Sequence, residues 1–179
     1  MLAVLSDTHS RRGHELAGRA RTAVERADEV VHAGDFTSEA ALDAFHDAAD
    51  RLHAVHGNAD DRSVQERLPE SRTVEYRSIR IAVTHTVRGG ATARSLFARE
   101  RGADLLVTGH THTPTFTDAD GLGLLNPGSH ADPRGGPASH AELRVETGGE
   151  NGGGRELRGE LRRRNGDLLR EFRLPAPTE

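Results

Sequence analysis

The chain has 179 residues and a formal net charge of −4 at pH 7, a length that suits one domain with a single substantial core. It contains no cysteine, which excludes disulfide bonds and thiolate metal sites and leaves oxygen atoms and imidazoles as metal ligands. The lack of any apolar stretch near the ~20 residues of a membrane span argues for a cytoplasmic protein without membrane partners, and the acidic balance argues against a nucleic-acid-binding surface.

The first third of the chain shows a β-α-β pattern. Residues 2–5 form an apolar strand, apolar residues recur at helical spacing over 16–27, and Val30-Val31 begin a second strand. Thr37 can cap a second helix, after which residues 52–55 give a third strand. The alternation of strands and helices predicts a parallel sheet.

The middle of the chain changes character. Residues 73–76 and 79–83 are predicted as a hairpin-like pair of strands because only a short break separates them. A third helix is predicted over about 92–101, followed by a strand over 105–107. The region from Thr115 onward is predicted to be mostly β-structure.

Short strands and turns are predicted to fill the last third, with strands at 115–117, 122–125 and 141–145. Residues 147–154 form a glycine-rich loop that we expect to be flexible, and a hairpin is expected over 157–174. Its strands cover Leu157–Arg163 and Leu168–Phe172, joined by Asn165-Gly166 as a type I′ turn. No internal repeat is visible, so residues 1–179 are expected to form a single domain.

Polar side chains follow the predicted strands at the points where each strand ends. Because the carboxyl ends of strands in an open α/β sheet meet in one crevice, these residues are expected to lie together. They supply carboxylate, amide and imidazole groups, which suit two divalent ions. The seven candidate ligands are Asp7, His9, Asp35, Asn58, His85, His110 and His112.

A pair of metal ions ~3.5–4 Å apart needs a bridging carboxylate, for which we select Asp35. A mixed shell of His, Asp and Asn favours Mn, Fe, Co, Zn or Ni over Mg and Ca, which prefer oxygen alone. Manganese is the expected ion. Asp35, Asn58 and His110 are the candidate catalytic residues.

Five short motifs occur in order, each after a predicted strand, and together they resemble the calcineurin-like metallophosphoesterases. The motifs are SDTH (6–9), HAGD (32–35), HGNAD (56–60), VTH (83–85) and GHTH (109–112). The resemblance covers residues 1 to about 146, and the compact length is similar to the small bacterial and archaeal phosphodiesterases of that superfamily. It implies a sandwich of two β-sheets flanked by helices, the four-layer fold of the family.

The resemblance also implies how the ligands divide between two metals, and a reaction in which a metal-bridging hydroxide attacks a small phosphoester, more readily a diester than a monoester. Asp35 belongs to both sites. The first site would hold Asp7, His9, Asp35 and His112, and the second Asp35, Asn58, His85 and His110.

A rival interpretation keeps the fold but not the chemistry, because the retromer subunit that sorts membrane cargo resembles these enzymes and serves as a protein-interaction scaffold. All seven ligand positions are filled here, which favours the enzyme. The sequence departs from relatives at two places: Ala59 follows Asn58 where they carry a histidine, and Val87 replaces the second histidine of a Thr-His-Gly-His motif. The oligomeric state is left open, with a homo-oligomer as one option.

Several other polar residues have two interpretations each. His32 either orients a ligand or is a hydrogen-bonded core residue, and Asp60 either holds its loop or is an exposed acid. The turn at 126–129 either lines the pocket or is a turn alone. His53 and His56 are expected in strand packing or at a sheet edge, while the residues expected at the surface are His14, His46, His140 and Arg162 to Arg164.

Overall fold

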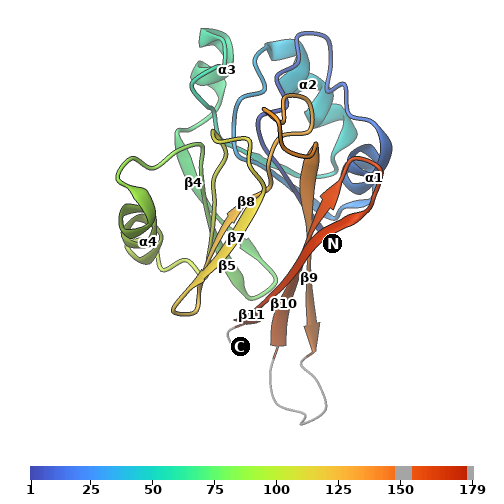
Figure 1. Cartoon of the computed structure of the whole chain (residues 1–179). Coiled ribbons are helices and arrows are strands. Elements are labelled where there is room, and N and C mark those ends of the chain that lie inside the picture. The colour runs from blue at the N-terminus through green and yellow to red at the C-terminus, as the bar shows by residue number, and fades with distance from the viewer. Residues whose placement is uncertain (148–154, 177–179) are drawn as a thin grey trace.

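A computed structural model of the chain describes residues 1–147 and 155–176. Two β-sheets pack face to face, α1 and α2 cover the outer side of one, and α4 covers the outer side of the other (Figure 1). This four-layer sandwich confirms the predicted fold class. The elements are β1 (Leu2–Leu5), α1 (Gly18–Arg26), β2 (Glu29–His32), α2 (Glu39–Ala48), β3 (Leu52–Ala54), α3 (Arg62–Arg67), β4 (Ser71–Tyr76), β5 (Ile79–Thr84), α4 (Gly90–Arg99), β6 (Leu105–Val107), β7 (Thr115–Ala119), β8 (Leu122–Asn126), β9 (Ser139–Thr147), β10 (Arg155–Arg163) and β11 (Leu168–Ala176).

Both sheets are mixed. The first has the order β11-β10-β9-β1-β2-β3, in which β1, β2 and β3 are parallel, as predicted, and β9 joins β1 antiparallel. The second has the order β4-β5-β6-β8-β7, with β5, β6 and β8 parallel and the predicted hairpin β4–β5 at one edge. Parallel strands β1, β2, β3, β5 and β6 therefore carry the site motifs at their carboxyl ends.

Three layers of hydrophobic residues hold the sandwich together. The alternation of side chains along β1 sends Leu2 and Val4 into the core between the sheets, and Ala3 and Leu5 into the core under α1 and α2. A smaller cluster packs Ala98 of α4 on the second sheet. Each sheet is thus covered on both faces, which agrees with the nearly continuous apolar runs of its parallel strands.

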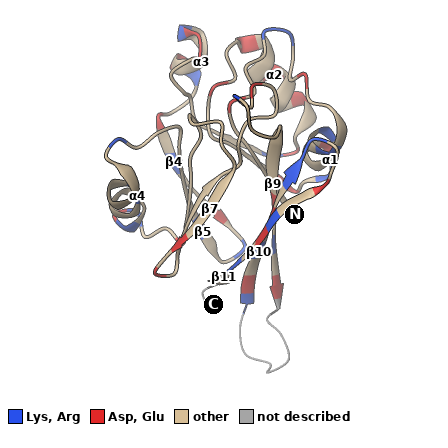
Figure 2. Cartoon of the chain, viewed as in Figure 1, with Lys and Arg blue, Asp and Glu red and all other residues tan. Residues whose placement is uncertain are grey.

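The C-terminal hairpin extends the first sheet, with basic and acidic residues side by side along β10 and β11 (Figure 2). Its turn differs from the prediction. Gly166 has φ 102°, but Asn165 is not left-handed, and the Gly166 N–H donates to the carbonyl of Arg163. A type I′ turn needs positive φ at both central residues, so the connection is a three-residue loop ending in a left-handed glycine.

One further local prediction is corrected, and one short helix was missed. Ser38 caps α2, since its hydroxyl accepts from the Ala41 N–H at 3.2 Å, whereas the predicted cap Thr37 has a left-handed backbone with φ 89°. An N-cap needs an extended backbone, which Thr37 does not have. The short helix α3 was not predicted, because only Val64 of its six residues is buried.

The expected glycine-rich loop lies, apart from Thr147, outside the described residues. Among the described residues, none of the helices has the length and apolar character needed to cross a membrane.

Candidate metal centre

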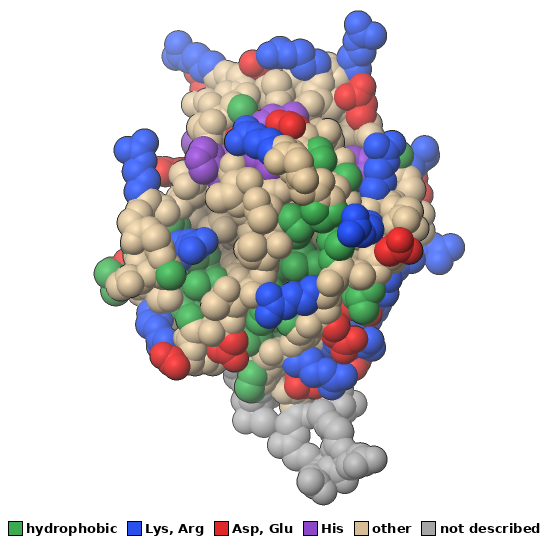
Figure 3. Space-filling model, in the orientation of Figure 1, with side chains coloured by type: hydrophobic (Ala, Val, Ile, Leu, Met, Phe, Trp, Pro, Cys, Tyr) green, Lys and Arg blue, Asp and Glu red, His purple; other side chains and the backbone are tan. Residues whose placement is uncertain are grey.

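The seven candidate ligands come together at the carboxyl ends of strands from both sheets. Asp7 and His9 follow β1, Asp35 follows β2, and the others follow β3, β5 and β6. Histidine side chains reach the surface in the upper part of the face seen in Figure 3. Elements far apart in the chain thus converge on one place, as the strand-end argument predicted.

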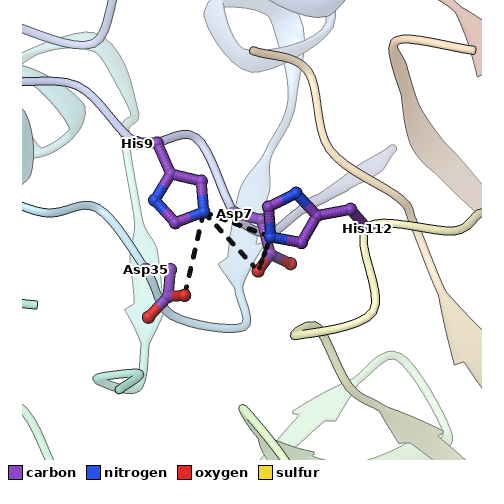
Figure 4. Close-up of side chains that lie close together, drawn as sticks. All are labelled: Asp7, His9, Asp35 and His112. Carbon is purple, nitrogen blue, oxygen red and sulfur yellow. Dashed lines mark hydrogen bonds and ion pairs between the residues drawn. The ribbon is translucent and has the colours of Figure 1, made fainter. Parts of the chain in front are cut away.

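The first group consists of Asp7, His9, Asp35 and His112, whose ligand atoms lie within 4.8 Å of one another. Figure 4 shows the four side chains pointing toward a common centre. The Nε2 atom of His112 lies 3.1 Å from Oδ1 of Asp7 and 3.2 Å from Nε2 of His9. His9 Nε2 lies 3.8 Å from Oδ2 of Asp35. His9 is partly exposed and the other three are buried.

The second group shares Asp35 with the first. Oδ2 of Asp35 lies 3.3 Å from Nε2 of His85. Oδ1 of Asn58 lies 3.1 Å from the same nitrogen and 2.8 Å from Nδ1 of His110. Asp35 is therefore placed between the two groups, where a bridging carboxylate would have to be. Asn58 and His110 are exposed, so this side of the centre opens to solvent.

The hydrogen bonds of the rings show that both groups fit a cation. His112 uses Nδ1 against the carbonyl of Asp132, and His85 uses Nδ1 against the carbonyl of Ala33 at 2.8 Å. Since Nδ1 must carry the proton in each bond, only Nε2 of each ring is left to face Asp7 or Asp35, and without a further proton on Nε2 that contact joins two acceptors. A proton would satisfy one such contact, whereas a metal ion satisfies every donor atom of a group at once.

The backbone at the centre is unusual, because five of the seven ligands have left-handed conformations. Their φ values are 52° for Asp7, 42° for His9, 62° for Asp35, 70° for His110 and 58° for His112. Non-glycine residues rarely adopt this region, and they persist there only where the surrounding structure enforces it. The turns are enforced by main-chain bonds between neighbouring loops, such as Asp7 N–H to Gly34 O at 2.9 Å and His9 N–H to Asp35 O at 3.0 Å.

Asp60 holds two of the ligand loops together. Its buried carboxylate accepts from the N–H groups of Gly57 at 2.7 Å, Asp35 at 3.0 Å and Thr37 at 2.7 Å. Of the two interpretations, the structure supports the loop-holding one. Burial raises the pKa of Asp60 against the opposing effect of these three bonds.

The turn at 126–129 supports Asp7 from behind. The hydroxyl of Ser129 donates to the carbonyl of Asp7 at 2.6 Å, and Ser6 Oγ lies 2.6 Å from Asp7 Oδ2 and 3.0 Å from the carbonyl of Gly128. Asn126 donates to the carbonyl of Gly109 at 2.7 Å, which fixes the loop of His110. The turn therefore positions ligands from beneath the site.

His32 is a buried core residue that also orders the loops. Gly34 N–H donates to its Nδ1 at 3.2 Å, so Nε2 carries the proton and donates to the hydroxyl of Thr8 at 3.0 Å. The ring stacks on Phe36 with centroids 3.7 Å apart. Burial lowers the pKa of His32 to about 3, which keeps it neutral.

The ionisation of Asp35 and His85 is coupled. Burial disfavours both charges, yet the hydrogen bond and the attraction between them lower the pKa of Asp35 and raise the pKa of His85. A negative Asp35 is the form that a cation requires. The centre therefore keeps its shared carboxylate ionised in its own right.

His140 was predicted at the surface, and this is wrong. The residue is fully buried in β9, with Nε2 at 3.1 Å from Oε1 of Glu142, whose two oxygens also receive Nε and Nη2 of Arg19 at 2.6 Å each. The pairing of β9 with β10 and the packing of α1 cover it. Nothing in the local sequence SHAEL (139–143) indicates that β10 and α1 bury His140.

A family model described as a calcineurin-like phosphoesterase superfamily domain matches residues 1–148. A probable metallophosphoesterase of Methanocaldococcus jannaschii is 36% identical over 151 residues, which cover 82% of this chain and 76% of that protein. A protein of the same organism named a phosphodiesterase is 24% identical over 147 residues, covering 71% of this chain and 82% of its own length.

Among solved structures, Vps29 of Chaetomium thermophilum aligns with a TM-score of 0.77 at 18% identity, covering 98% of this chain and 97% of that one. At this identity the likeness shows the fold alone.

Proposed function

Because the chain belongs to the calcineurin-like phosphoesterase superfamily, we propose that it is a dinuclear metal-dependent phosphoesterase acting on a small phosphoester. The observation that carries the proposal is that two clusters of oxygen and nitrogen ligand atoms share Asp35. In each cluster the ligand atoms lie close enough together to bind one cation. We further propose a phosphodiesterase, which the name of one relative supports. The cytoplasm remains the predicted location.

For the metals and their ligands we propose the division that the family resemblance implies. Asp7, His9, Asp35 and His112 would hold one divalent ion, and Asp35, Asn58, His85 and His110 the other, with Mn as the proposed ion and Fe, Co, Zn or Ni as alternatives. Bound there, two such ions would supply a hydroxide nucleophile near neutral pH and positive charge that stabilises the transition state of phosphoryl transfer.

The chain's own residues divide the remaining work. Asp35 holds the two halves of the centre together, because both His9 and His85 lie against its Oδ2. Asn58 and His110 are the exposed members, so we expect them to face the phosphoryl oxygens of the substrate. Two dications against Asp7 and Asp35 leave a net positive centre, which attracts phosphate although the protein is acidic overall.

The test uses bis(4-nitrophenyl) phosphate with Mn, on the wild type and on Asp35→Asn and His85→Ala. Each variant should lose turnover by more than about 10³-fold with a native circular dichroism spectrum, and chelation should inactivate the wild type reversibly. His46→Ala is the matched control, since His46 is exposed on α2 away from the centre. Near-normal activity of either ligand variant, or of chelated wild type, would refute the dinuclear proposal.

A non-catalytic scaffold of the same fold is the second candidate. The alignment with Vps29 supports it only at the level of the fold. The complete ligand set favours the enzyme. If the protein hydrolyses neither monoesters nor diesters with any of the proposed ions, the non-catalytic scaffold is favoured.

A further inference from the structure

Arg94 lies beside the candidate metal centre, and no acidic side chain in the part of the chain that the structure describes forms an ion pair with it. It belongs to α4 and lines a cavity of about 230 Å³ together with His85 and His110, two of the proposed ligands. The cavity therefore extends from the exposed side of the second group to Arg94. No acidic group is among its lining residues.

One nitrogen of the Arg94 guanidinium also lacks a hydrogen-bond partner. Its Nε is buried and has no hydrogen-bond partner, and none of the described residues forms an ion pair with it. By contrast, Arg99 of the same helix donates to the carbonyl of Ala119 at 3.2 Å. A buried donor without an acceptor is costly, so a partner from outside the chain is the simplest way to satisfy it.

The N-terminus of α4 adds to the positive character of the same cavity. Gly90, the first residue of the helix, lines the cavity, and the N-cap Gly89 supplies no side-chain acceptor for the free N–H groups. The first turn contains no acidic residue. Uncapped N–H groups and the helix dipole favour an anion at this end.

A second cavity, on the other side of His85, has the opposite character. It is lined by Asn58 and His85 and also by Glu70, whose carboxylate would repel an anion. Of the two hollows next to the centre, only the one at Arg94 combines an unpaired cation with an uncapped helix start.

Resting on the proposed function, we propose that Arg94 and the N-terminus of α4 form a subsite for a second anionic group of the substrate. The substrate class is then a phosphoester that carries a further carboxylate or phosphate a few bonds from the scissile phosphorus. The phosphoryl group lies at the metal centre and the second anion lies against Arg94. Diesters such as bis(4-nitrophenyl) phosphate, whose only charge is on the phosphodiester itself, use the centre but leave the subsite empty.

The test measures binding, so that it does not depend on turnover. Calorimetric titration of the Mn-loaded protein compares 2-carboxyethyl phosphate with its amide, 2-carbamoylethyl phosphate, which keeps the phosphate but lacks the carboxylate charge. The comparison is repeated with the pair that is one methylene longer. The wild type should bind the better-fitting acid about tenfold more tightly than its amide, the effect expected of a charge-assisted hydrogen bond. Arg94→Gln should bring the ratio within about twofold, and Arg94→Lys should retain part of it.

Arg99→Gln is the matched control, because it removes the same charge from the same helix without touching the cavity. It should keep the wild-type ratio. Equal binding of acid and amide by the wild type at both lengths, or a preference that survives Arg94→Gln, would overturn the subsite. Failure of the Mn-loaded wild type to bind any of the four phosphates would instead overturn the proposed metal centre, and the subsite with it.

Discussion

The ion pair between Arg19 and Glu142 is expected to contribute strongly to the stability of the fold. Glu142 has no exposed surface, and both of its oxygens accept from the guanidinium of Arg19 at 2.6 Å. The pair connects α1 to β9. Among the described residues, no other ion pair of comparable burial joins these two elements. We therefore choose Glu142→Gln, which keeps the shape and removes the charge.

The magnitude follows from the pKa of Glu142. Burial acts to raise it, but hydrogen bonds from His140 and Arg19 and their charges lower the pKa to about 2 from 4.5. A shift of this size corresponds to about 3 kcal/mol. Because the pKa is lowered in the folded state, this stability is present above pH 4.5 and is lost as the pH falls through about 2. About 0.8 kcal/mol is gone at pH 4 and about 2 kcal/mol at pH 3.

At pH 7 the Glu142→Gln protein should be less stable by about 3–5 kcal/mol, since Arg19 is left partly buried without its charge partner. The gap to the wild type should narrow by about 2 kcal/mol between pH 7 and pH 3. Urea unfolding followed by circular dichroism measures both. The control is Glu25→Gln on the exposed face of α1, which should cost about 0.5 kcal/mol or less. A loss below about 1 kcal/mol at pH 7, or a gap that does not change with pH, would refute the reasoning.

Two further predictions concern the centre. Asp60→Asn removes one acceptor oxygen from a carboxylate that accepts from three N–H donors. The free energy of unfolding, measured with urea, should fall by about 2 kcal/mol. The affinity for Mn, measured by metal titration, should fall at least about tenfold. Wild-type values of both would contradict this role. Because Ala59 and Val87 provide no acid, kcat/KM across a diester series should fall steeply with rising leaving-group pKa, and Ala59→His should help alkyl esters most, within the ~10²–10⁴-fold of a positioned acid. A flat series for the wild type would reveal an acid elsewhere.

The ligand cluster could be predicted because its signals are local. A short apolar run such as Leu105–Val107, followed at once by Gly109 and His110, shows both a strand and its functional end. The strand bounds agree there to the residue. The expected division of the ligands into two groups came from the family resemblance and not from these local signals, since it depends on how Asp35 is placed between His9 and His85 across two sheets.

The errors arose where distant segments override local preference. Asn165-Gly166 favours a type I′ turn by itself, but the pairing of β10 and β11 shifts register between Leu161 and Arg162 and selects another loop. His140 looks exposed until β10 and α1 cover it. The importance of Asp132 was missed for a related reason, because it acts through a contact with His112, a residue more than a dozen positions away.

The left-handed backbone of the ligands has a consequence for any effort to make this protein more heat-resistant. For residues other than glycine, that conformation costs about 1–2 kcal/mol each, so five such ligands amount to about 5–10 kcal/mol, comparable to the whole net stability of an ordinary domain. Glycine relieves the cost, and His9→Gly should therefore raise the melting temperature while it removes a ligand. Selection for thermostability alone would favour glycine at these turns and eliminate the proposed metal centre, so each round of such selection has to include an assay of metal binding.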